Sequence, residues 1–322
     1  MSSVSIVMCT YNGAAYLARQ LDSILDQTWP VAEILIQDDG STDETCAIIR
    51  SYQEKYPFIR LVRNEKNLGF NLNFLTAIPK AKGDYIALSD QDDLWEPDKI
   101  ATLVHCLETS GKAFVFSRSR PFSDDTATDT YFDTRRPNCS MERLIICNMA
   151  SGHTMLFTRG FARELTPARF AQTSRWYYDH FIAAMAAAAG ELVFCDRVLV
   201  NYRRHTEQVT ADHDTTFLRT AGPVRVMRRA CRLYREKKEV MTAYFRNKYD
   251  FFSSLPFRNQ PLADALKMAD LFTRRDPVSY LKLTFLCVKL RKRIFYTADV
   301  RPVALFFRSF VFPLYCALYF KD

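Results

Sequence analysis

The sequence lacks the signatures of several common protein classes. Its nine cysteines are scattered and include no CxxC pair, which argues against a disulfide framework and against a structural zinc site. The first residues, MSSVSIVMCTYNG, contain no basic region followed by an apolar stretch of signal-peptide length, so we do not expect export. Internal repeats and low-complexity segments are absent as well. Together these features favour a globular protein with reduced thiols in the cytoplasm.

Two common phosphate-binding fingerprints are also missing. A dinucleotide site requires G-x-G-x-x-G after the first strand, where CTYNGAAYLA offers only Gly13. The P-loop pattern G-x-x-x-x-G-K-[ST] does not occur in the chain. A nicotinamide-dependent enzyme is therefore disfavoured.

Charge is distributed unevenly along the 322 residues, whose net charge is +8 at pH 7. Residues 1–213 carry 22 Lys and Arg against 27 Asp and Glu, a net charge of −5. Residues 214–322 carry 22 against 9, a net charge of +13, together with many aromatic side chains. We therefore expect a catalytic domain over 1–213 and a helical, basic region over 214–322 that attaches to an anionic partner.

Strand and helix signals alternate in the first hundred residues. The pattern predicts strands at 4–11, 32–41, 59–64 and 84–93, and helices at 14–28, 43–56 and 71–81. Further along, it predicts a loop over 147–158 that enters a strand, a helix over 178–189 that stops at Gly190, and strands at 192–194 and 198–202. Such units predict an α/β fold with a mostly parallel sheet, flanked by helices, that binds ligands at the carboxyl ends of its strands.

Three polar clusters occur where predicted strands end. Thr10, Tyr11 and Asn12 follow the first strand, Asp38 to Ser41 follow the second, and Asp90 to Asp93 follow the fourth. Because the carboxyl ends of parallel strands meet at one edge of a sheet, we expect these three loops to line one crevice.

The spacing of Asp90 and Asp92 suits a divalent cation that also contacts a diphosphate. Mg²⁺ and Mn²⁺ prefer oxygen ligands and keep positions open for phosphate oxygens, so one or two carboxylates are enough. The alternative is an acidic turn that caps the next helix, which starts near EPDK. The neighbouring clusters favour the metal site.

Asp38 and Asp39 precede a Gly-Ser-Thr turn and allow two roles. A carboxylate there can accept a hydrogen bond from the imide N–H of uracil or thymine, or bind a ribose hydroxyl. Alternatively it forms an Asx turn that stabilises its own backbone. We expect one aspartate to serve each role.

Polar residues in the second half of the first domain are further candidates. Asp179 starts a predicted helix, where it is either a general base or a helix N-cap. His205 follows a strand and either completes the metal or diphosphate site or is a surface residue. Arg203 and Arg204 are candidates for pairing with phosphate. His180 is expected to serve in packing or to support the site from behind.

Residues 3–210 resemble the inverting glycosyltransferases of family 2, which have the GT-A fold. The resemblance rests on the segments VSIVMCTYNGAAYL, ILIQDDGSTDET, NLGFNLNF, GDYIALSDQDDLWEPDK, GHTMLFTR and YYDHFIAAMAAAAGELVFCDRVLVNYRRH, taken in this order and spacing. DQDDxW, the GxTM loop and the terminal YRxH make it most similar to bacterial rhamnosyl- and hexosyltransferases of lipopolysaccharide, O-antigen, capsule or cell-wall polysaccharide synthesis.

The resemblance implies a role for each matching residue. It implies that Thr10, Tyr11, Asn12, Asp38, Asp39, Asp90 and Arg204 contact the nucleotide sugar, Asp92 and His205 hold Mg²⁺ or Mn²⁺, Asp179 is the catalytic base, and Gly152, His153, Thr154, Met155 and Tyr178 lie on the acceptor side. Asp39 would contact the base, Asp90 the ribose side, and Asp38 would be a secondary or structural contact. Related sequences often have HDWW where this chain has YDHF, so the identity of the acceptor does not transfer.

The implied reaction is inverting transfer of rhamnose or a hexose from a dTDP- or UDP-linked donor to a glycan or lipid-linked acceptor. The rival within catalysis is a nucleotidyltransferase, which usually has a Gly-rich basic loop after the first strand that is missing here. A rival outside catalysis is an inactive module that binds sugar nucleotides or membranes.

The last residues alternate Lys and Arg with large apolar side chains. Residues 302–320 are nearly long enough to span a bilayer, but Arg308 and Pro313 interrupt them. We therefore expect an in-plane helix on anionic lipid, on the cytoplasmic face of the inner membrane, rather than a span. The alternative is a helical packing region with a solvated basic face. Nucleic-acid binding is disfavoured because no recognition motif accompanies the charge.

Overall fold

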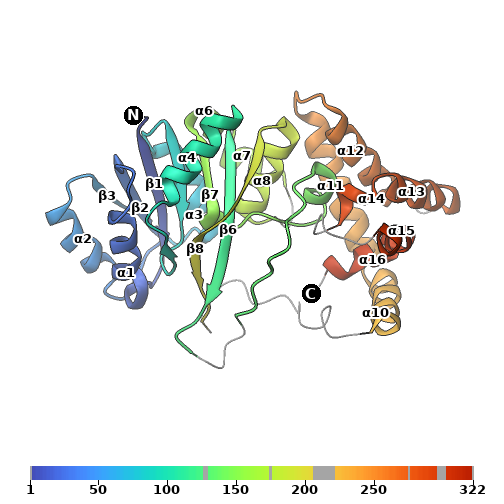
Figure 1. Ribbon diagram of the computed structural model, residues 1–322, viewed down its shortest axis with the longest axis horizontal. Helices are drawn as coiled ribbons and strands as arrows, with labels where there is room; N and C mark the ends of the chain where they lie inside the picture. Colours follow the sequence, from blue (N-terminus) through green and yellow to red (C-terminus); the bar gives the residue numbers. More distant parts are fainter. Residues whose placement is uncertain are drawn as a thin grey trace.

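The computed structural model describes residues 2–125, 130–173, 176–205, 222–274, 276–295 and 302–320. Eight strands form one mixed sheet in the order β3-β2-β1-β4-β7-β6-β8-β5 (Figure 1). The strands are β1 (Val4–Thr10), β2 (Glu33–Asp38), β3 (Ile59–Arg63), β4 (Tyr85–Ser89), β5 (Leu94–Trp95), β6 (Phe114–Phe122), β7 (Met155–Thr158) and β8 (Leu192–Arg203). Helices flank this sheet, which confirms the predicted α/β class.

Helices precede and follow β8, the last strand along the chain. Up to β8 they are α1 (Ala14–Leu25), α2 (Thr45–Lys55), α3 (Phe70–Ala77), α4 (Lys99–Ser110), α5 (Met141–Leu144), α6 (Arg159–Ala162), α7 (Pro167–Phe170) and α8 (Tyr178–Ala189). After β8 they are α10 (Pro223–Glu236), α11 (Lys238–Ser254), α12 (Gln260–Thr273), α13 (Pro277–Lys289), α14 (Arg291–Ile294), α15 (Pro302–Phe310) and α16 (Phe312–Tyr315). Short 3₁₀ turns are η1 (Ile78–Lys80), η2 (Gly152–Thr154) and η3 (Cys316–Tyr319).

The sheet has a parallel part and a mixed part. β1 pairs in parallel with β2 and β4, and β2 pairs in parallel with β3, as the alternating pattern predicts. β7 is antiparallel to both β4 and β6, and β5 is antiparallel to β8. The two strands predicted at 192–194 and 198–202 are one strand, β8, whose register with β6 shifts near Arg118. No prediction covered β5 or β6.

Side chains alternate along β1 between two buried cores. Ile6 and Met8 join the core that α1 and α4 cover, whereas Val7 and Cys9 join the opposite core with α3 and α8. Because both faces of β1 are apolar, its sequence is a continuous apolar run rather than an alternating one.

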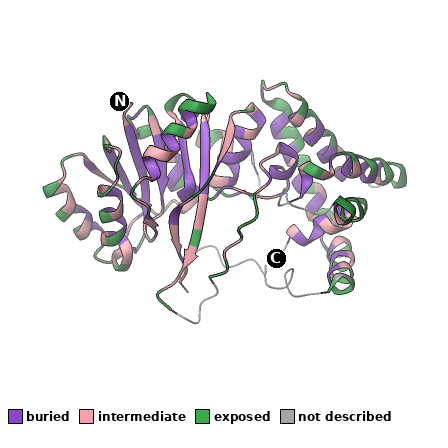
Figure 2. Ribbon diagram, viewed as in Figure 1, coloured by how far each residue is buried: buried purple, intermediate pink, exposed green. Residues whose placement is uncertain are grey.

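The C-terminal helices share a core with the first part of the chain. α8 is apolar on nearly all sides, and nine of its residues are buried. Phe181 of α8 contacts Phe251 of α11, with ring centroids 6.1 Å apart, and the same buried cluster continues through α12 and α13 (Figure 2). The predicted domain boundary at 213/214 lies outside the described residues, and the division into two domains remains a prediction.

The segment 302–320 is bent instead of forming one in-plane helix. Across the described residues, no single helix is long and apolar enough to cross a membrane; α15 and Phe312–Tyr319 pass that test only together, and they are bent by 75° at the break. Phe312 and Cys316 are buried, and the Phe320 ring packs 4.9 Å from that of Tyr244. One continuous helix over 302–320 is therefore wrong, because the residues after α15 pack into the protein core, and membrane contact of α15 remains a prediction.

Candidate functional site

The three polar loops meet at the carboxyl ends of β1, β2 and β4. The backbone N–H of Tyr11 donates to Gln91 Oε1 at 2.9 Å, and the N–H of Asn12 donates to Ser41 Oγ at 2.9 Å. A Cβ on Gly13 would lie 2.2 Å from Gln91 Oε1, so a larger residue would have to displace the Gln91 amide from Tyr11. The loops that follow the three strands thus form one edge, with the half-exposed Tyr11 ring on its surface.

Asp38 is fully buried and serves its own turn. Its carboxylate accepts hydrogen bonds from Thr10 Oγ1 at 3.0 Å, from the N–H of Gly40 at 3.1 Å and from the N–H of Ser41 at 3.0 Å. The Ser41 hydroxyl donates to it as well. These contacts match the Asx-turn alternative, and a contact of Asp38 with a nucleotide remains a prediction.

Asp39 is held by the segment that precedes α3. Its Oδ1 accepts from Asn64 Nδ2 at 2.7 Å and from the N–H of Leu68 at 2.8 Å, and its Oδ2 accepts from the N–H of Gly69 at 2.8 Å. Gly69 has a φ of +77°, which glycine adopts readily and which orients its N–H toward the carboxylate. Three donors leave Asp39 capacity for one further donor, such as an imide N–H.

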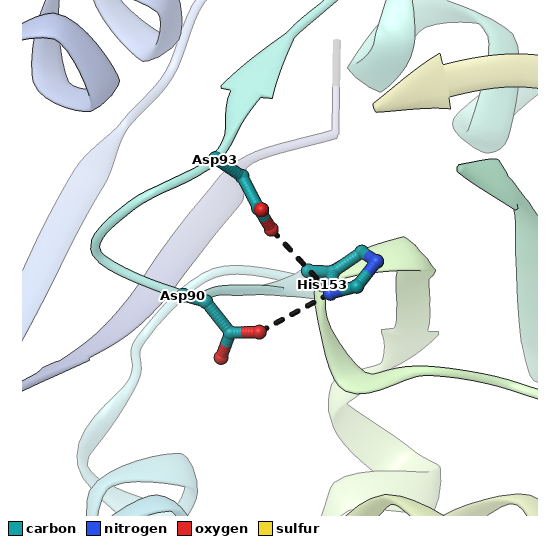
Figure 3. A group of neighbouring side chains, drawn as sticks. All are labelled: Asp90, Asp93 and His153. Carbon is teal, nitrogen blue, oxygen red and sulfur yellow. Dashed lines mark hydrogen bonds and ion pairs between the residues drawn. The ribbon is translucent and has the colours of Figure 1, made fainter. Parts of the chain in front are cut away.

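Asp90 and Asp93, in the loop after β4, and His153 of η2 form a compact group (Figure 3). His153 Nδ1 lies 3.2 Å from Asp90 Oδ2 and 3.4 Å from Asp93 Oδ2. Both carboxylates face the same ring nitrogen, which can donate a hydrogen bond to either of them when it carries a proton. Burial alone lowers the pKa of His153, and the Asp93 and Asp90 carboxylates raise it above its ordinary value.

A buried lysine supports the same group. Lys99, at the start of α4, donates from Nζ to the carbonyl of His153 at 2.7 Å, and its Nζ lies 3.2 Å from the centre of the Trp95 ring. Burial lowers the pKa of Lys99 well below its usual value, while Asp93 and Asp90 oppose this effect. Burial also raises the pKa of Asp93 to about 7, against the charge of His153.

Asp92 and His205 form a separate and more accessible pair. Asp92 Oδ2 lies 2.9 Å from His205 Nε2, and the two side chains are 16% and 17% exposed. By contrast, the side chains of His153 and Asp93 are 5% and 0% exposed. Burial and the Asp90 charge raise the pKa of Asp92, and the contact with His205 opposes this rise. A cation from solvent can therefore reach Asp92 and His205 more easily than the buried group.

The two predicted phosphate-binding arginines have different surroundings. Arg203 is buried; its Nε donates to the Asp92 carbonyl at 2.9 Å, and its guanidinium also contacts Asp124. It therefore holds the loop in place and does not face solvent. Arg204 is partly exposed and lies beside the Tyr202 ring, at 5.9 Å from its centre. Tyr202 in turn stacks on His153, so Arg204 lies close to the carboxylate group.

Asp179 lies in the first turn of α8. The N-cap position belongs to Tyr177, and Asp179 Oδ1 accepts from the N–H of His180 at 2.7 Å, so the N-cap alternative is wrong. Burial raises the pKa of Asp179 to about 7; the hydrogen bond from His180 opposes this rise, and the Asp90 charge adds to it. A carboxyl that titrates near neutral pH is suited to accept a proton.

Residues predicted for the acceptor side are mostly enclosed. The Tyr178 ring stacks on Phe74 at 4.2 Å, and its hydroxyl packs directly on Gly152. Thr154 and Met155 are buried, with the Thr154 hydroxyl donating to the Ser151 carbonyl at 2.7 Å. In this structure these two side chains support the site from behind, and their role toward an acceptor remains a prediction.

Several residues around the site were not predicted. Gln91, Lys99, Asn148 and the 64–69 segment all contact predicted residues. The segment NLGFNLNF is one of the segments on which the family resemblance rests. The resemblance thus indicated that this segment matters, but it did not predict the contact with Asp39.

Comparison with known proteins identifies a family. The model of Glycosyl transferase family 2 matches residues 5–166. An uncharacterized protein of Mycobacterium tuberculosis is 30% identical over 213 residues, which cover 64% of this chain and 60% of that protein. The dTDP-rhamnosyl transferase RfbG of Shigella flexneri is 35% identical over 136 residues, which cover 41% of this chain and 44% of RfbG. The chain thus spans three fifths or less of the length of these two curated relatives.

Solved structures support the same fold. S. aureus TarS 1–349 in complex with UDP-GlcNAc superposes with a TM-score of 0.56 at 13% identity, over 91% of this chain and 81% of TarS. The mannosyltransferase PcManGT of Pyrobaculum calidifontis, in complex with GDP-Man and Mn²⁺, gives a TM-score of 0.56 at 19% identity, over 98% of this chain and 85% of PcManGT. These likenesses confirm the predicted GT-A fold.

Proposed function

Because the chain belongs to glycosyltransferase family 2, we propose that it transfers rhamnose or a hexose from a nucleoside diphosphate to a hydroxyl of a glycan or lipid-linked acceptor. One observation carries this proposal. The nucleotide-binding candidates after β1 and β2 contact each other and the loop after β4, which holds the carboxylates, and α8 starts near them, because the N–H of Tyr178, next to Asp179, donates to Asn71 Oδ1 at 2.8 Å at the start of α3. A sugar nucleotide and an acceptor hydroxyl could meet at such an edge.

A divalent cation fits the donor groups at this edge. Asp92 and His205 offer a carboxylate oxygen and an imidazole nitrogen 2.9 Å apart, both partly exposed, and Asp90 adds a carboxylate that is 34% exposed. Mg²⁺ and Mn²⁺ accept such ligands. When bound, the ion would supply positive charge that offsets the charge of the departing diphosphate. We prefer Asp92 and His205 as ligands over Asp93 and His153, because the side chains of Asp93 and His153 are buried and a cation from solvent reaches them less easily.

The proposed base is Asp179. In its ionised form the carboxylate takes the proton of the acceptor hydroxyl, and the oxygen attacks the anomeric carbon. The bond between that carbon and the diphosphate oxygen breaks, and the leaving group keeps the electron pair. Attack from the face opposite the leaving group inverts the anomeric configuration. The N–H of His180 orients the carboxylate through Oδ1.

The donor and the setting extend this proposal. The name of RfbG, a dTDP-rhamnosyl transferase, supports dTDP-rhamnose as a donor, and the TarS complex with UDP-GlcNAc supports UDP-sugars as the alternative. Asp39 would accept a hydrogen bond from the imide N–H of either base. We place the enzyme in bacterial surface polysaccharide synthesis, on the cytoplasmic face of the inner membrane, where a lipid-linked acceptor would be found.

Calorimetric titration with a panel of UDP-, dTDP- and GDP-sugars, with and without Mn²⁺, tests the donor site. We expect one donor to bind only with Mn²⁺ and its affinity to fall about tenfold or more in Asp92→Ala and His205→Ala. The matched control is His105→Ala, since His105 is exposed on α4 away from the crevice loops. Binding of a donor that is equally tight without metal and in all variants would contradict the metal site. Metal-dependent binding without turnover would favour the inactive-module alternative.

A further inference from the structure

Two neighbouring helices of the C-terminal region expose large apolar side chains. These are Val278, Leu281 and Phe285 of α13 and Val303, Phe306, Phe307 and Phe310 of α15, which we call the outer apolar face. α13 and α15 pack against each other, and they lie at the end of the molecule farthest from α2 (Figures 1 and 2). The exposed fraction reaches 70% for Phe285 and 67% for Phe307, so the described residues leave this face open.

The outer apolar face follows the helical repeat. Its members are spaced by three and four residues, which places them within an arc of about 100° on each helix. The opposite sides of the same helices are already in the core, where Leu283 and Leu286 of α13 and Leu305 of α15 are buried. Both helices are thus apolar on two sides, which is typical of helices that also contact something other than water.

Lysines lie within the apolar arc of α13. Lys282 and Lys289 are exposed and are spaced three and four residues from Phe285, so they share its side of the helix. Arg308 is exposed on α15. Aromatic rings beside lysines suit an interface in which rings enter the acyl boundary and cations meet anionic headgroups. A symmetric contact with a second copy would instead bury these lysines against an equally basic face.

We propose that the outer apolar face binds the surface of an anionic lipid bilayer, with α13 and α15 lying in the plane of the membrane. The residues after α15 are buried in the core and bend away by 75°, which favours surface binding over a span. The proposal deepens the proposed function by naming the surface on which a lipid-linked acceptor would be met. The proposal concerns lipid binding alone. Lipid binding can therefore fail while donor binding succeeds, and donor binding can fail while lipid binding succeeds.

Sedimentation of the full chain with vesicles tests this face. We expect binding to phosphatidylethanolamine–phosphatidylglycerol vesicles, weakened by salt, and little binding to phosphatidylcholine vesicles. Phe306→Ser with Phe307→Ser, and separately Lys282→Glu with Lys289→Glu, should each lower the partition coefficient about tenfold. The matched controls are Tyr249→Ser, an exposed ring on α11, and Lys55→Glu on α2.

Thermal unfolding establishes that each variant is folded. If the phenylalanine variant does not fold, the lysine variant carries the test, because its side chains are exposed and touch no core. Equal binding of wild type and both double variants, or no binding to the anionic vesicles, would overturn the proposal. So would a wild-type dimer that the phenylalanine variant converts to a monomer, since the face would then join two copies.

Discussion

The pKa of Asp179 leads to a prediction about catalysis. Burial, and more weakly the nearby Asp90 charge, raise this pKa from 3.8 to about 7 against the hydrogen bond from the His180 N–H. Only the ionised carboxyl can accept the proton of the acceptor. We therefore expect kcat/KM to rise about tenfold per pH unit on the acid side of this pKa and to level off above it. Asp179→Asn should lower kcat by about a hundredfold or more and leave donor affinity unchanged.

The same substitution should strengthen the fold. The pKa of this carboxyl is higher in the folded state than in the unfolded chain. Its ionisation therefore destabilises the fold: the effect begins as the pH rises above the unfolded value and is complete above the folded value. A pKa difference of about three corresponds to on the order of 4 kcal/mol, which partial solvent access reduces to about 2 kcal/mol. Asparagine keeps the oxygen that accepts from His180 and removes the charge. The free energy of unfolding at pH 8 should therefore increase by about 1–2 kcal/mol in Asp179→Asn.

Release of nucleoside diphosphate measured from about pH 5 to about pH 9, together with urea unfolding at pH 8, provides the assay. Asp250→Asn, an exposed carboxyl on α11, is the control and should change neither quantity. Unchanged turnover in Asp179→Asn, or a pH profile that is flat through neutral pH, would refute Asp179 as the base.

Three further substitutions probe the packing around the site. Gly152→Ala places a Cβ 1.9 Å from the Tyr178 hydroxyl, so we expect a loss of about 1–3 kcal/mol in unfolding free energy, measured in urea, and a lower kcat. In Asp39→Asn the side-chain NH₂ faces the N–H of Leu68 or of Gly69, so two donors oppose each other. We expect the free energy of unfolding to fall by about 1–3 kcal/mol and donor binding to weaken in calorimetry. His153→Gln removes the ring that both carboxylates contact, so urea unfolding should show a loss of about 1–3 kcal/mol.

Matched controls exist for each of these substitutions. Gly160→Ala has ordinary space for a Cβ, with the nearest atom at 3.8 Å. Asp26→Asn and His105→Gln change exposed residues of the same types. A stable and fully active Gly152→Ala protein would show that Tyr178 can move freely. Stability losses no larger than those of the controls would argue against the contacts assigned to Asp39 and His153.

Local patterns were sufficient to predict which polar loops follow the parallel strands. The apolar runs that form β1, β2 and β4 end next to their polar clusters, so strand ends and loops could be placed without tertiary information. α8 was predicted with its observed bounds because its apolar run is long and Gly190 ends it with a φ of +75°. The fold and family could therefore be recognised from residues that are close together in the sequence.

Contacts between distant residues could not be predicted in this way. The group of Asp90, Asp93 and His153 joins positions about 60 residues apart. Lys99 contacts the His153 carbonyl only because the start of α4 lies next to this group in the fold. A run of apolar residues likewise does not reveal which of its sides will be buried. The 302–320 segment has one composition throughout, yet α15 is exposed on its outer side and the residues after it are in the core.

Hydrolysis of the donor, followed by proton NMR, tests the central claim most directly because it needs no knowledge of the acceptor. The wild-type enzyme is incubated with Mn²⁺ and each nucleotide sugar, and the anomer of the sugar released first is identified. The proposed mechanism predicts that water replaces the acceptor slowly, that the first sugar has the anomeric configuration opposite to that of the donor, and that Asp179→Asn abolishes its formation. Release with retained configuration, or release at the wild-type rate from Asp179→Asn, would contradict inverting transfer with Asp179 as the base.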